Sequence, residues 1–253
     1  MSDIISKASK YFDQLRETEG DELYIDKSSI KHAPPAAPVE NASNTVQDIE
    51  QSVSEPAGEK LRNWQSASNL DELNELIHDC IECPLGETRN KFVFGEGNPN
   101  AEIFVIGEGP GADEDAQGRP FIGRAGQLLT KILKAIEFER EDVFIGNIVK
   151  CRPPNNRRPE AAEVEKCEQY LHKQIELIDP QFILALGLTA VDTLLKSKHK
   201  MADIRGNFMD YRGRRMMVTY HPAALLRNPA LKKPVWEDVQ KLRAAYDEYM
   251  KSK

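Results

Sequence analysis

Short runs dominated by apolar residues recur along the chain from about residue 66 onward, and amphipathic stretches separate them. The runs lie at 103–106, 143–148, 182–186 and 216–220, and their length is typical of strands that are buried on both faces of a sheet. The stretches with apolar residues at helical spacing lie at 71–78, 127–136, 161–177, 189–195 and 235–250. Strands that alternate with helices predict a parallel sheet with helices on both faces.

The first 65 residues have a different pattern. Residues 1–18 have apolar side chains near one face of a short amphipathic helix, which either docks onto a protein partner or is only marginally stable alone. Residues 19–65 lose this periodicity and are rich in Pro, Glu, Ser and Asn, a composition typical of a disordered linker. We therefore predict one globular domain over residues 66–253.

The apolar segments are too short for a membrane protein. No run approaches the roughly 18 to 20 apolar residues that a membrane helix needs. The first residues, MSDIISKASKYFDQL, lack the apolar core of a secretory signal. We expect a cytoplasmic, monomeric protein without membrane contact, in a compartment that keeps thiols reduced.

Charge is unevenly distributed along the chain. The 253 residues carry 34 Lys and Arg against 41 Asp and Glu, a net charge of −7 that argues mildly against a nucleic-acid partner. Residues 150–158, however, include four basic side chains and no acidic one, and residues 200–233 include eight basic side chains against two acidic ones. Local basic patches set the attraction for phosphate, so the composition does not exclude nucleic acid.

All four cysteines of the chain fall into a pattern typical of a metal site. Cys80 and Cys83 form a C-x2-C pair, and Cys151 and Cys167 follow in C-x15-C spacing. In a reducing compartment four cysteines are more often metal ligands or nucleophiles than disulfides. Zinc and an iron–sulfur cluster both fit the spacing, and the wide second pair favours the cluster. The alternative is four unconnected buried thiols.

Aromatic and polar residues gather where the predicted strands end. The first strand leads into 107–129, GEGPGADEDAQGRPFIGRAGQLL, which we interpret as a long ligand loop with an exposed Phe121. Asn147 lies at the end of the second strand and His221 directly after the fourth. Because the carboxyl ends of parallel strands meet at one edge, we expect these three side chains at one rim.

These three side chains suit a pyrimidine that is flipped out of DNA. An Asn amide accepts a hydrogen bond from N3–H and donates one to O4, a pattern that uracil offers and cytosine does not. An aromatic ring stacks on the base, and a histidine near O2 stabilises the charge that develops as the glycosidic bond breaks. Each has an ordinary alternative: Asn147 as a turn cap, Phe121 as core and His221 as a structural histidine.

Two further groups would complete such a site. The apolar pair of Leu225 and Leu226, next to Arg227, is suited to wedge into a duplex and grip a phosphate, although adjacent leucines are more often core. A carboxylate would hold the attacking water. Glu108 and the acidic run at 113–115 are the candidates, unless they form a solvated acidic face.

Three blocks of the sequence together resemble one protein family. They are GEGPGADEDAQGRPFIGRAGQLL, GNIVKCRPPNNRRP and HPAALLRNP. With the four cysteines, they make roughly residues 70–250 similar to the family 4 uracil-DNA glycosylases, the iron–sulfur branch of their superfamily. The resemblance implies an α/β fold, a three-layer α/β/α sandwich around a four-stranded parallel sheet. It also implies a [4Fe–4S] cluster bound by Cys80, Cys83, Cys151 and Cys167.

The resemblance also implies site residues. The uracil pocket would be formed by Gly107, Glu108, Gly109, Phe121, Asn147 and His221, and DNA would contact Arg152, Leu225, Leu226 and Arg227. The best-known branch has a water-activating aspartate where this chain has Gly109, so that task passes to Glu114 or Glu108, and we favour Glu114. A related branch links covalently to DNA through a histidine in a basic insertion, which this chain lacks between Cys151 and Cys167.

The expected activity is hydrolysis of the N-glycosidic bond of deoxyuridine in DNA, which releases uracil and leaves an abasic site. Two alternatives belong to other classes of protein. An iron–sulfur redox protein would need only the cysteines and would leave Asn147, Phe121 and His221 unexplained. A module that binds damaged DNA without cutting it would use the same pocket and differ only in turnover.

Overall fold

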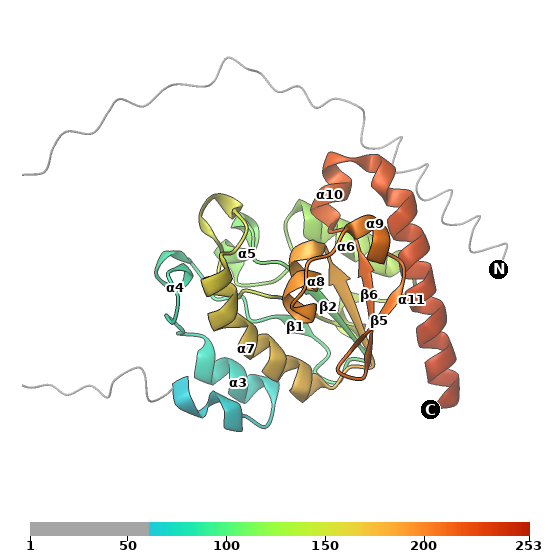
Figure 1. Cartoon of the computed structure of the whole chain (residues 1–253). Coiled ribbons are helices and arrows are strands. Elements are labelled where there is room, and N and C mark those ends of the chain that lie inside the picture. The colour runs from blue at the N-terminus through green and yellow to red at the C-terminus, as the bar shows by residue number, and fades with distance from the viewer. Residues whose placement is uncertain (1–60) are drawn as a thin grey trace, which may run out of the picture. The chain divides into compact units, whose positions relative to one another are not determined.

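The centre of the fold is a six-stranded sheet (Figure 1). The structure is a computed structural model that describes residues 61–253; the predicted N-terminal helix and all but the last few residues of the predicted linker lie outside the described residues. The inner strands are β2 (Ile103–Gly107), β3 (Phe144–Asn147), β4 (Phe182–Leu186) and β6 (Arg214–Thr219). They run parallel in the order β3-β2-β4-β6, so the predicted parallel core is confirmed.

Two antiparallel edge strands correct the prediction of a purely four-stranded sheet. Strand β1 (Glu96–Gly97) pairs with β3, and β5 (Phe208–Tyr211) pairs with β6. The β5–β6 hairpin turns at Arg212 and Gly213, which both have positive φ, 52° and 81°, as a two-residue hairpin turn requires. The hydrophobic pattern did not predict these strands because β1 has two residues and β5 is half-exposed.

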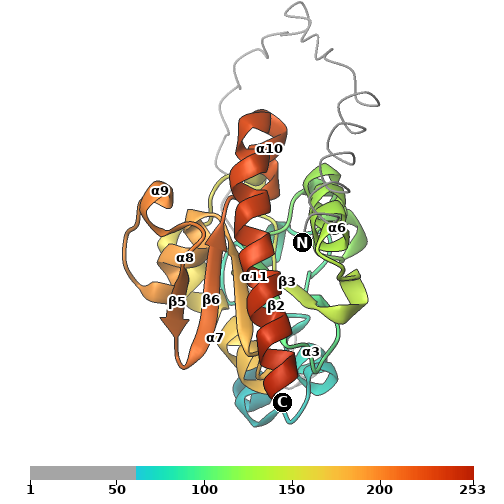
Figure 2. The same ribbon diagram turned by 90° about the vertical axis from the view of Figure 1, so that its right-hand side faces the viewer.

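Alternate residues of the inner strands face two separate hydrophobic layers. Helices α3 (Leu70–Ile77), α7 (Ala161–Ile178) and α8 (Leu188–Leu195) cover one face, and α6 (Arg124–Ala135), α10 (Pro222–Arg227) and α11 (Lys232–Ser252) cover the other. Figure 2 shows α11 running across its face of the sheet. The inner strands β2, β3 and β4 are buried at every position, which is why they are apolar along their length except for Asn147 at the end of β3. The three-layer α/β/α sandwich is therefore confirmed.

Short elements connect this framework. They are η2 (Leu61–Ser66), α4 (Leu85–Thr88), α5 (Ala112–Gln117), η3 (Arg140–Asp142), η4 (Pro154–Asn156), α9 (Met201–Ile204) and η5 (Pro229–Leu231). Trp64, just before the predicted start of the domain, packs edge-on against Tyr170 of α7 with ring centroids 5.2 Å apart. In residues 61–253, no helix has both the length and the apolar character to cross a bilayer.

The segment between β2 and α6 differs from the long loop that the sequence predicts. It contains the helix α5, whose first turn begins after Gly111 and whose last turn ends at Gly118 with φ 77°. Phe121 is 5% exposed and is not on the surface. The segment is therefore an ordered arm that is folded back against the sheet.

Candidate active site

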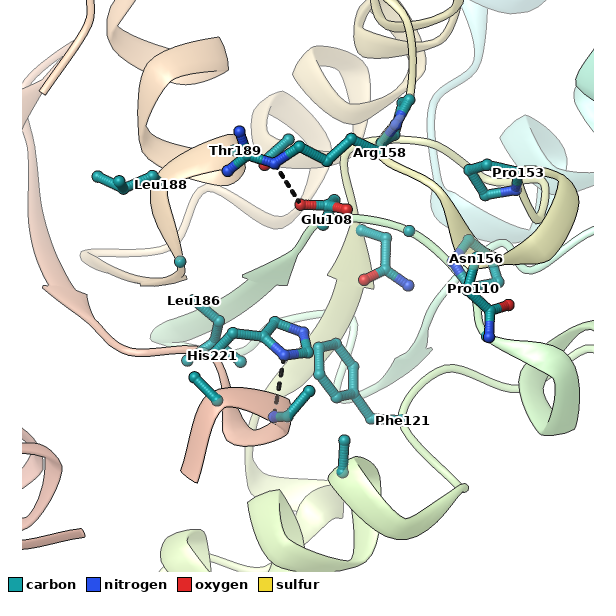
Figure 3. A pocket seen from close by; sticks show the side chains of 18 of the residues that line it. Glu108, Pro110, Phe121, Pro153, Asn156, Arg158, Leu186, Leu188, Thr189 and His221 are labelled. Atoms are coloured by element: carbon teal, nitrogen blue, oxygen red, sulfur yellow. Dashed lines mark hydrogen bonds and ion pairs between the residues drawn. The ribbon is translucent and has the colours of Figure 1, made fainter. Parts of the chain in front are cut away.

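A cavity of about 660 Å³ opens at the carboxyl ends of the parallel strands (Figure 3). Its walls come from the segments that follow β2, β3, β4 and β6, the place where an open α/β sheet binds its ligands. Six of the predicted pocket and catalytic residues line it: Glu108, Gly109, Glu114, Phe121, Asn147 and His221. The structure thus brings together side chains that are up to 113 positions apart in the chain (108 to 221).

Gly107 lies directly behind the cavity wall. It pairs with Asn147 in the β2–β3 register. A Cβ atom at this position would come within 2.4 Å of the Phe121 ring and 2.5 Å of Asn147 Oδ1. Only glycine therefore lets the Phe121 ring and the Asn147 amide approach the strand end so closely.

The Asn147 side chain has an unmet hydrogen-bonding need. It is 2% exposed, and its Oδ1 has no hydrogen-bond partner among the described residues. An unpaired buried acceptor costs about 1–3 kcal/mol, so such atoms in a cavity wall commonly await a ligand. The predicted alternative of a turn cap for Asn147 has no support, because a cap would engage this oxygen.

The rings of His221 and Phe121 lie next to each other in the cavity wall (Figure 3). Their ring centroids lie 5.5 Å apart, and the ring planes are inclined by 33°. His221 is also the N-cap of α10, where its Nδ1 accepts a hydrogen bond from Ala223 N at 3.2 Å. The proton of the neutral ring therefore lies on Nε2. Burial, reinforced by the nearby charge of Arg227, lowers the pKa of His221 to about 4, so the imidazole is neutral at pH 7.

The two candidate carboxylates are held differently. Glu114 accepts hydrogen bonds from the backbone N–H groups of Ile122 and Gly123, both at 2.9 Å, and of Gly111 at 3.1 Å. These bonds use about three of the roughly four lone-pair sites of a carboxylate. Glu108 instead faces Arg158, with 3.8 Å between Oε2 and the arginine Nε (Figure 3). Glu114 therefore braces the arm, whereas Glu108 makes one long ion pair.

The predicted DNA-contacting residues are not all on the cavity. Arg227 lines it. Leu225 is 2% exposed and belongs to the core under α10, so the wedge predicted for the pair is wrong for Leu225 and stays a prediction for the half-buried Leu226. Arg152 does not line the cavity, but it donates a hydrogen bond at 2.7 Å to Oδ1 of Asn156, which does.

Other lining residues were not singled out from the sequence. Arg157 and Arg158 belong to the basic segment at 150–158, and only that charge pattern signalled them. Arg157 donates two hydrogen bonds to the Glu163 carboxylate. Thr189, at the start of α8, lines the cavity with a buried Oγ1 that has no hydrogen-bond partner among the described residues, and no sequence pattern indicated it.

The four cysteines come from the segment before α4, the segment after β3 and helix α7. Cys151 accepts a hydrogen bond from Arg89 at 3.3 Å, and Cys167 accepts one from the backbone N–H of Lys150 at 3.2 Å. Cys80 lies 3.3 Å from the Tyr170 hydroxyl. Burial is the main cause that raises the pKa of Cys151 to about 11 and that of Cys167 to about 12; the other thiols contribute to both shifts, whereas Arg89 opposes the first and Lys150 the second. The thiols are therefore close enough to interact electrostatically.

A single metal ion and a four-iron cluster place different requirements on the four thiols. Within residues 61–253, no three His, Cys, Asp or Glu side chains converge as a single metal ion would require. A zinc ion draws its sulfur ligands to about 2.3 Å from one point, whereas a four-iron cluster takes one thiolate for each iron. N–H donors directed at two of the four sulfurs would suit thiolate ligands of either kind of site.

Lys150 connects this region to the cavity. Its side chain is fully buried and its Nζ donates to the backbone carbonyl of Asn147 at 2.9 Å and to Gln174 Oε1 at 2.5 Å. Gln174 in turn donates to the carbonyl of Phe94 at 2.9 Å. The end of β3 that presents Asn147 is therefore tied to α7, the helix that also presents Cys167.

Comparison with known proteins decides the family. Residues 94–243 match the family model described as the Uracil DNA glycosylase superfamily. The chain belongs to this superfamily. It is 45% identical over 181 residues to a Type-4 uracil-DNA glycosylase of Pyrobaculum aerophilum, which covers 68% of this chain and 91% of that protein. It is 44% identical over 179 residues to a Type-4 uracil-DNA glycosylase of Thermotoga maritima, which covers 69% of this chain and 93% of that protein.

A Type-4 uracil-DNA glycosylase of Saccharolobus solfataricus is 45% identical over 186 residues, which cover 70% of this chain and 86% of that protein. The resemblance inferred from the sequence blocks is therefore confirmed. The part of the chain that matches the superfamily includes every residue that lines the cavity, from Glu108 to Arg227.

Proposed function

We infer that this member of the superfamily is a uracil-DNA glycosylase. It flips deoxyuridine out of DNA, hydrolyses the N-glycosidic bond, and releases uracil from a strand that keeps an abasic site. The buried Oδ1 of Asn147, which has no partner among the described residues, carries this inference together with the neighbouring rings of Phe121 and His221. Asn147 is suited to the hydrogen-bonding edge of uracil, Phe121 to the face of its ring, and His221 to its O2 oxygen. The identity to proteins named Type-4 uracil-DNA glycosylases supports it.

In the proposed mechanism, three side chains bind and polarise the base. The ring of Phe121 stacks on uracil. Asn147 accepts from N3–H through Oδ1 and donates to O4 through Nδ2, and cytosine would offer the opposite pattern. As the bond between N1 and C1′ breaks, its electron pair moves into the base, and the Nε2–H of His221 stabilises the charge at O2. The neutral state of His221 leaves this proton in place.

Water completes the reaction at C1′. Its oxygen bonds to the sugar carbon and its proton passes to a carboxylate or to solvent. Glu114 is our candidate for holding that water through its remaining lone pair, with Glu108 as the second candidate, and both line the cavity. Leu226 and Arg227 would occupy the gap left in the duplex and bind a phosphate, which offsets the few kcal/mol of base flipping.

We also propose that Cys80, Cys83, Cys151 and Cys167 hold a [4Fe–4S] cluster. The hydrogen bonds from Arg89 and from Lys150 N to two of the sulfurs support this proposal, since such donors stabilise thiolate ligands. When bound, the cluster would clamp segments that are distant in sequence and so fix the end of β3. Hydrolysis transfers no electron, so the cluster needs no redox role in it.

Release of uracil from an oligonucleotide with a single deoxyuridine tests the function. The wild type should release uracil, and Asn147→Ala and His221→Ala should each lower the single-turnover rate by about 10² or more. His199→Ala is the matched control, because His199 binds Asp192 away from the cavity. Full activity in both cavity variants would overturn the assignment. A wild type that binds uracil-containing DNA tightly but releases no base would instead favour a non-catalytic damage-binding protein.

A further inference from the structure

Phe121 has a backbone conformation that a bulky residue rarely adopts. Its φ is 50°, in the left-handed region where the Cβ of an L-residue crowds the following carbonyl. The ring is nevertheless buried in the cavity wall, 5.5 Å from the His221 ring. Such a conformation persists only where surrounding groups hold it.

Arg140 of η3 holds the carbonyl side of this turn. Its Nη1 donates to the Phe121 carbonyl at 3.0 Å, and its Nη2 donates to the Pro120 carbonyl at 2.8 Å. Nη1 also donates to Thr130 Oγ1 of α6 at 3.2 Å. One guanidinium group therefore fixes two consecutive carbonyl groups relative to the neighbouring helix.

Glu96 of β1 holds Arg140 in turn. Its Oε1 accepts from Arg140 Nη2 at 2.5 Å, and its Oε2 accepts from Arg119 Nε at 2.8 Å. The Arg140 side chain is 15% exposed and that of Glu96 is 23% exposed, so solvent screens this pair less than a surface pair. Burial alone would raise the pKa of Glu96, but the two arginines outweigh it and hold that pKa below its usual range. The carboxylate is therefore charged at neutral pH.

The backbone of helix α6 packs closely against the turn at Phe121. A Cβ atom on Gly126 would lie 1.9 Å from the carbonyl carbon of Phe121, so the helix backbone packs directly against this peptide. On the other side, the N–H groups of Ile122 and Gly123 are bound by Glu114. The peptide group between Phe121 and Ile122 is thus held at both ends, its carbonyl by Arg140 and its N–H by Glu114.

We propose that Arg140 and Glu96 are positioning residues of the uracil pocket, which keep Phe121 in its left-handed conformation and so hold its ring against the base. The proposal rests on the proposed function for what stacks on the ring. Neither residue lines the cavity, and both act through Phe121. Arg140 binds the carbonyl groups, and Glu96 keeps the guanidinium in place.

The substitution Arg140→Gln tests this role by uracil release under single-turnover conditions. We expect the rate to fall about ten-fold, which corresponds to about 1.4 kcal/mol. In a Phe121→Ala background the same substitution should change the rate by less than about two-fold, because the ring that it positions is gone. Binding to an abasic oligonucleotide should stay unchanged, since that DNA offers no base to stack.

Arg243→Gln is the matched control. Arg243 Nη1 donates to the carbonyls of Ile136 and Glu137 at 2.9 and 3.1 Å, and Glu137 has a φ of 60°. This arginine thus supports a second left-handed residue in the same way, but away from the cavity. Its loss should lower the melting temperature without slowing uracil release. Equal loss of activity in both variants would overturn the proposal, as would a full effect of Arg140→Gln in the Phe121→Ala background.

Two further measurements keep the proposal testable. Should Arg140→Gln fail to fold, Glu96→Gln keeps an acceptor oxygen and should slow release in the same direction by less, and an unchanged rate would overturn the role. The NMR shifts of the His221 ring report the neighbouring Phe121 ring without any reaction. They should move in Arg140→Gln and not in Arg243→Gln, so they decide the positioning role even if the wild type released no uracil.

Discussion

Acidification should destabilise this protein through His221, because the folded cavity disfavours the protonated imidazole. Burial is the main reason, the charge of Arg227 adds to it, and Glu114 opposes it. Protonation would also remove the lone pair with which Nδ1 accepts the hydrogen bond from Ala223 N. The perturbation is therefore a decrease in pH below the pKa that the ring has in the unfolded chain.

The magnitude follows from the difference between the two pKa values. The pKa of His221 falls from 6.5 in the unfolded chain to about 4 in the folded protein. Between these values the unfolded state binds a proton that the folded state does not, so the free energy of unfolding decreases as the pH is lowered. At about 1.4 kcal/mol per pKa unit the loss is about 3 kcal/mol. This contribution is fully present above pH 6.5 and is lost as the pH falls to about 4.

Urea unfolding of the wild type and of His221→Asn at a series of pH values measures this contribution. Asparagine is a good N-cap, so the variant keeps an acceptor for Ala223 N and loses only the titrating group. Other groups of the protein titrate equally in both chains and cancel in the difference. We expect the wild type to lose about 3 kcal/mol more than the variant over this range. The reasoning would be refuted if the free energies of unfolding of the wild type and of His221→Asn changed equally with pH. An NMR titration that gave His221 a pKa near 6.5 would also refute it.

Three further predictions concern the cavity mouth, α10 and the cysteines. Arg158→Ala should reduce the slope of log binding constant against log salt by about one, as measured by fluorescence anisotropy with uracil-containing DNA. Leu225→Ala should lower the free energy of unfolding by about 2–5 kcal/mol, whereas Leu226→Ala, at a half-buried position, should lower it less and should slow uracil release more from duplex than from single-stranded DNA. If the four cysteines hold the proposed cluster, Cys167→Ser should abolish its broad visible absorption and lower the iron content of the purified protein.

The parallel core and its helices could be predicted because burial on both faces leaves a direct trace in the sequence. The strand at 182–186 is one example: all five of its residues are buried, and all are apolar. The edge strand β5 leaves no such trace, since only Tyr211 of its four residues is buried. Its position depends instead on the turn at Arg212 and Gly213, which the hydrophobic pattern does not describe.

The residues that we propose contact the base were brought into one cavity as their places after the strands predicted, whereas the residues that support them could not be predicted. Asn147 and His221 are recognisable because the ends of parallel strands meet at one edge. Leu225 was assigned to a wedge because sequence spacing does not show which of two adjacent leucines faces the core. Arg140 carries no motif, and its importance appears only when its two carbonyl partners, 19 and 20 positions earlier, lie beside it.

Glu114 and its neighbour Asp115 differ in what their carboxylates contact. Asp115 is 1% exposed, and its carboxylate accepts hydrogen bonds from the backbone N–H and the side-chain amide of Asn90, so its role is structural. Glu114 makes three comparable backbone hydrogen bonds, yet it also lines the cavity. Those bonds fix the carboxylate and the amide side of the Phe121 turn together. A water held by Glu114 would consequently have a defined position relative to a base stacked on Phe121, which is what proximity catalysis requires. Glu108, with one long ion pair to an exposed arginine, has no comparable constraint, and for this reason we retain Glu114 as the candidate that positions the water.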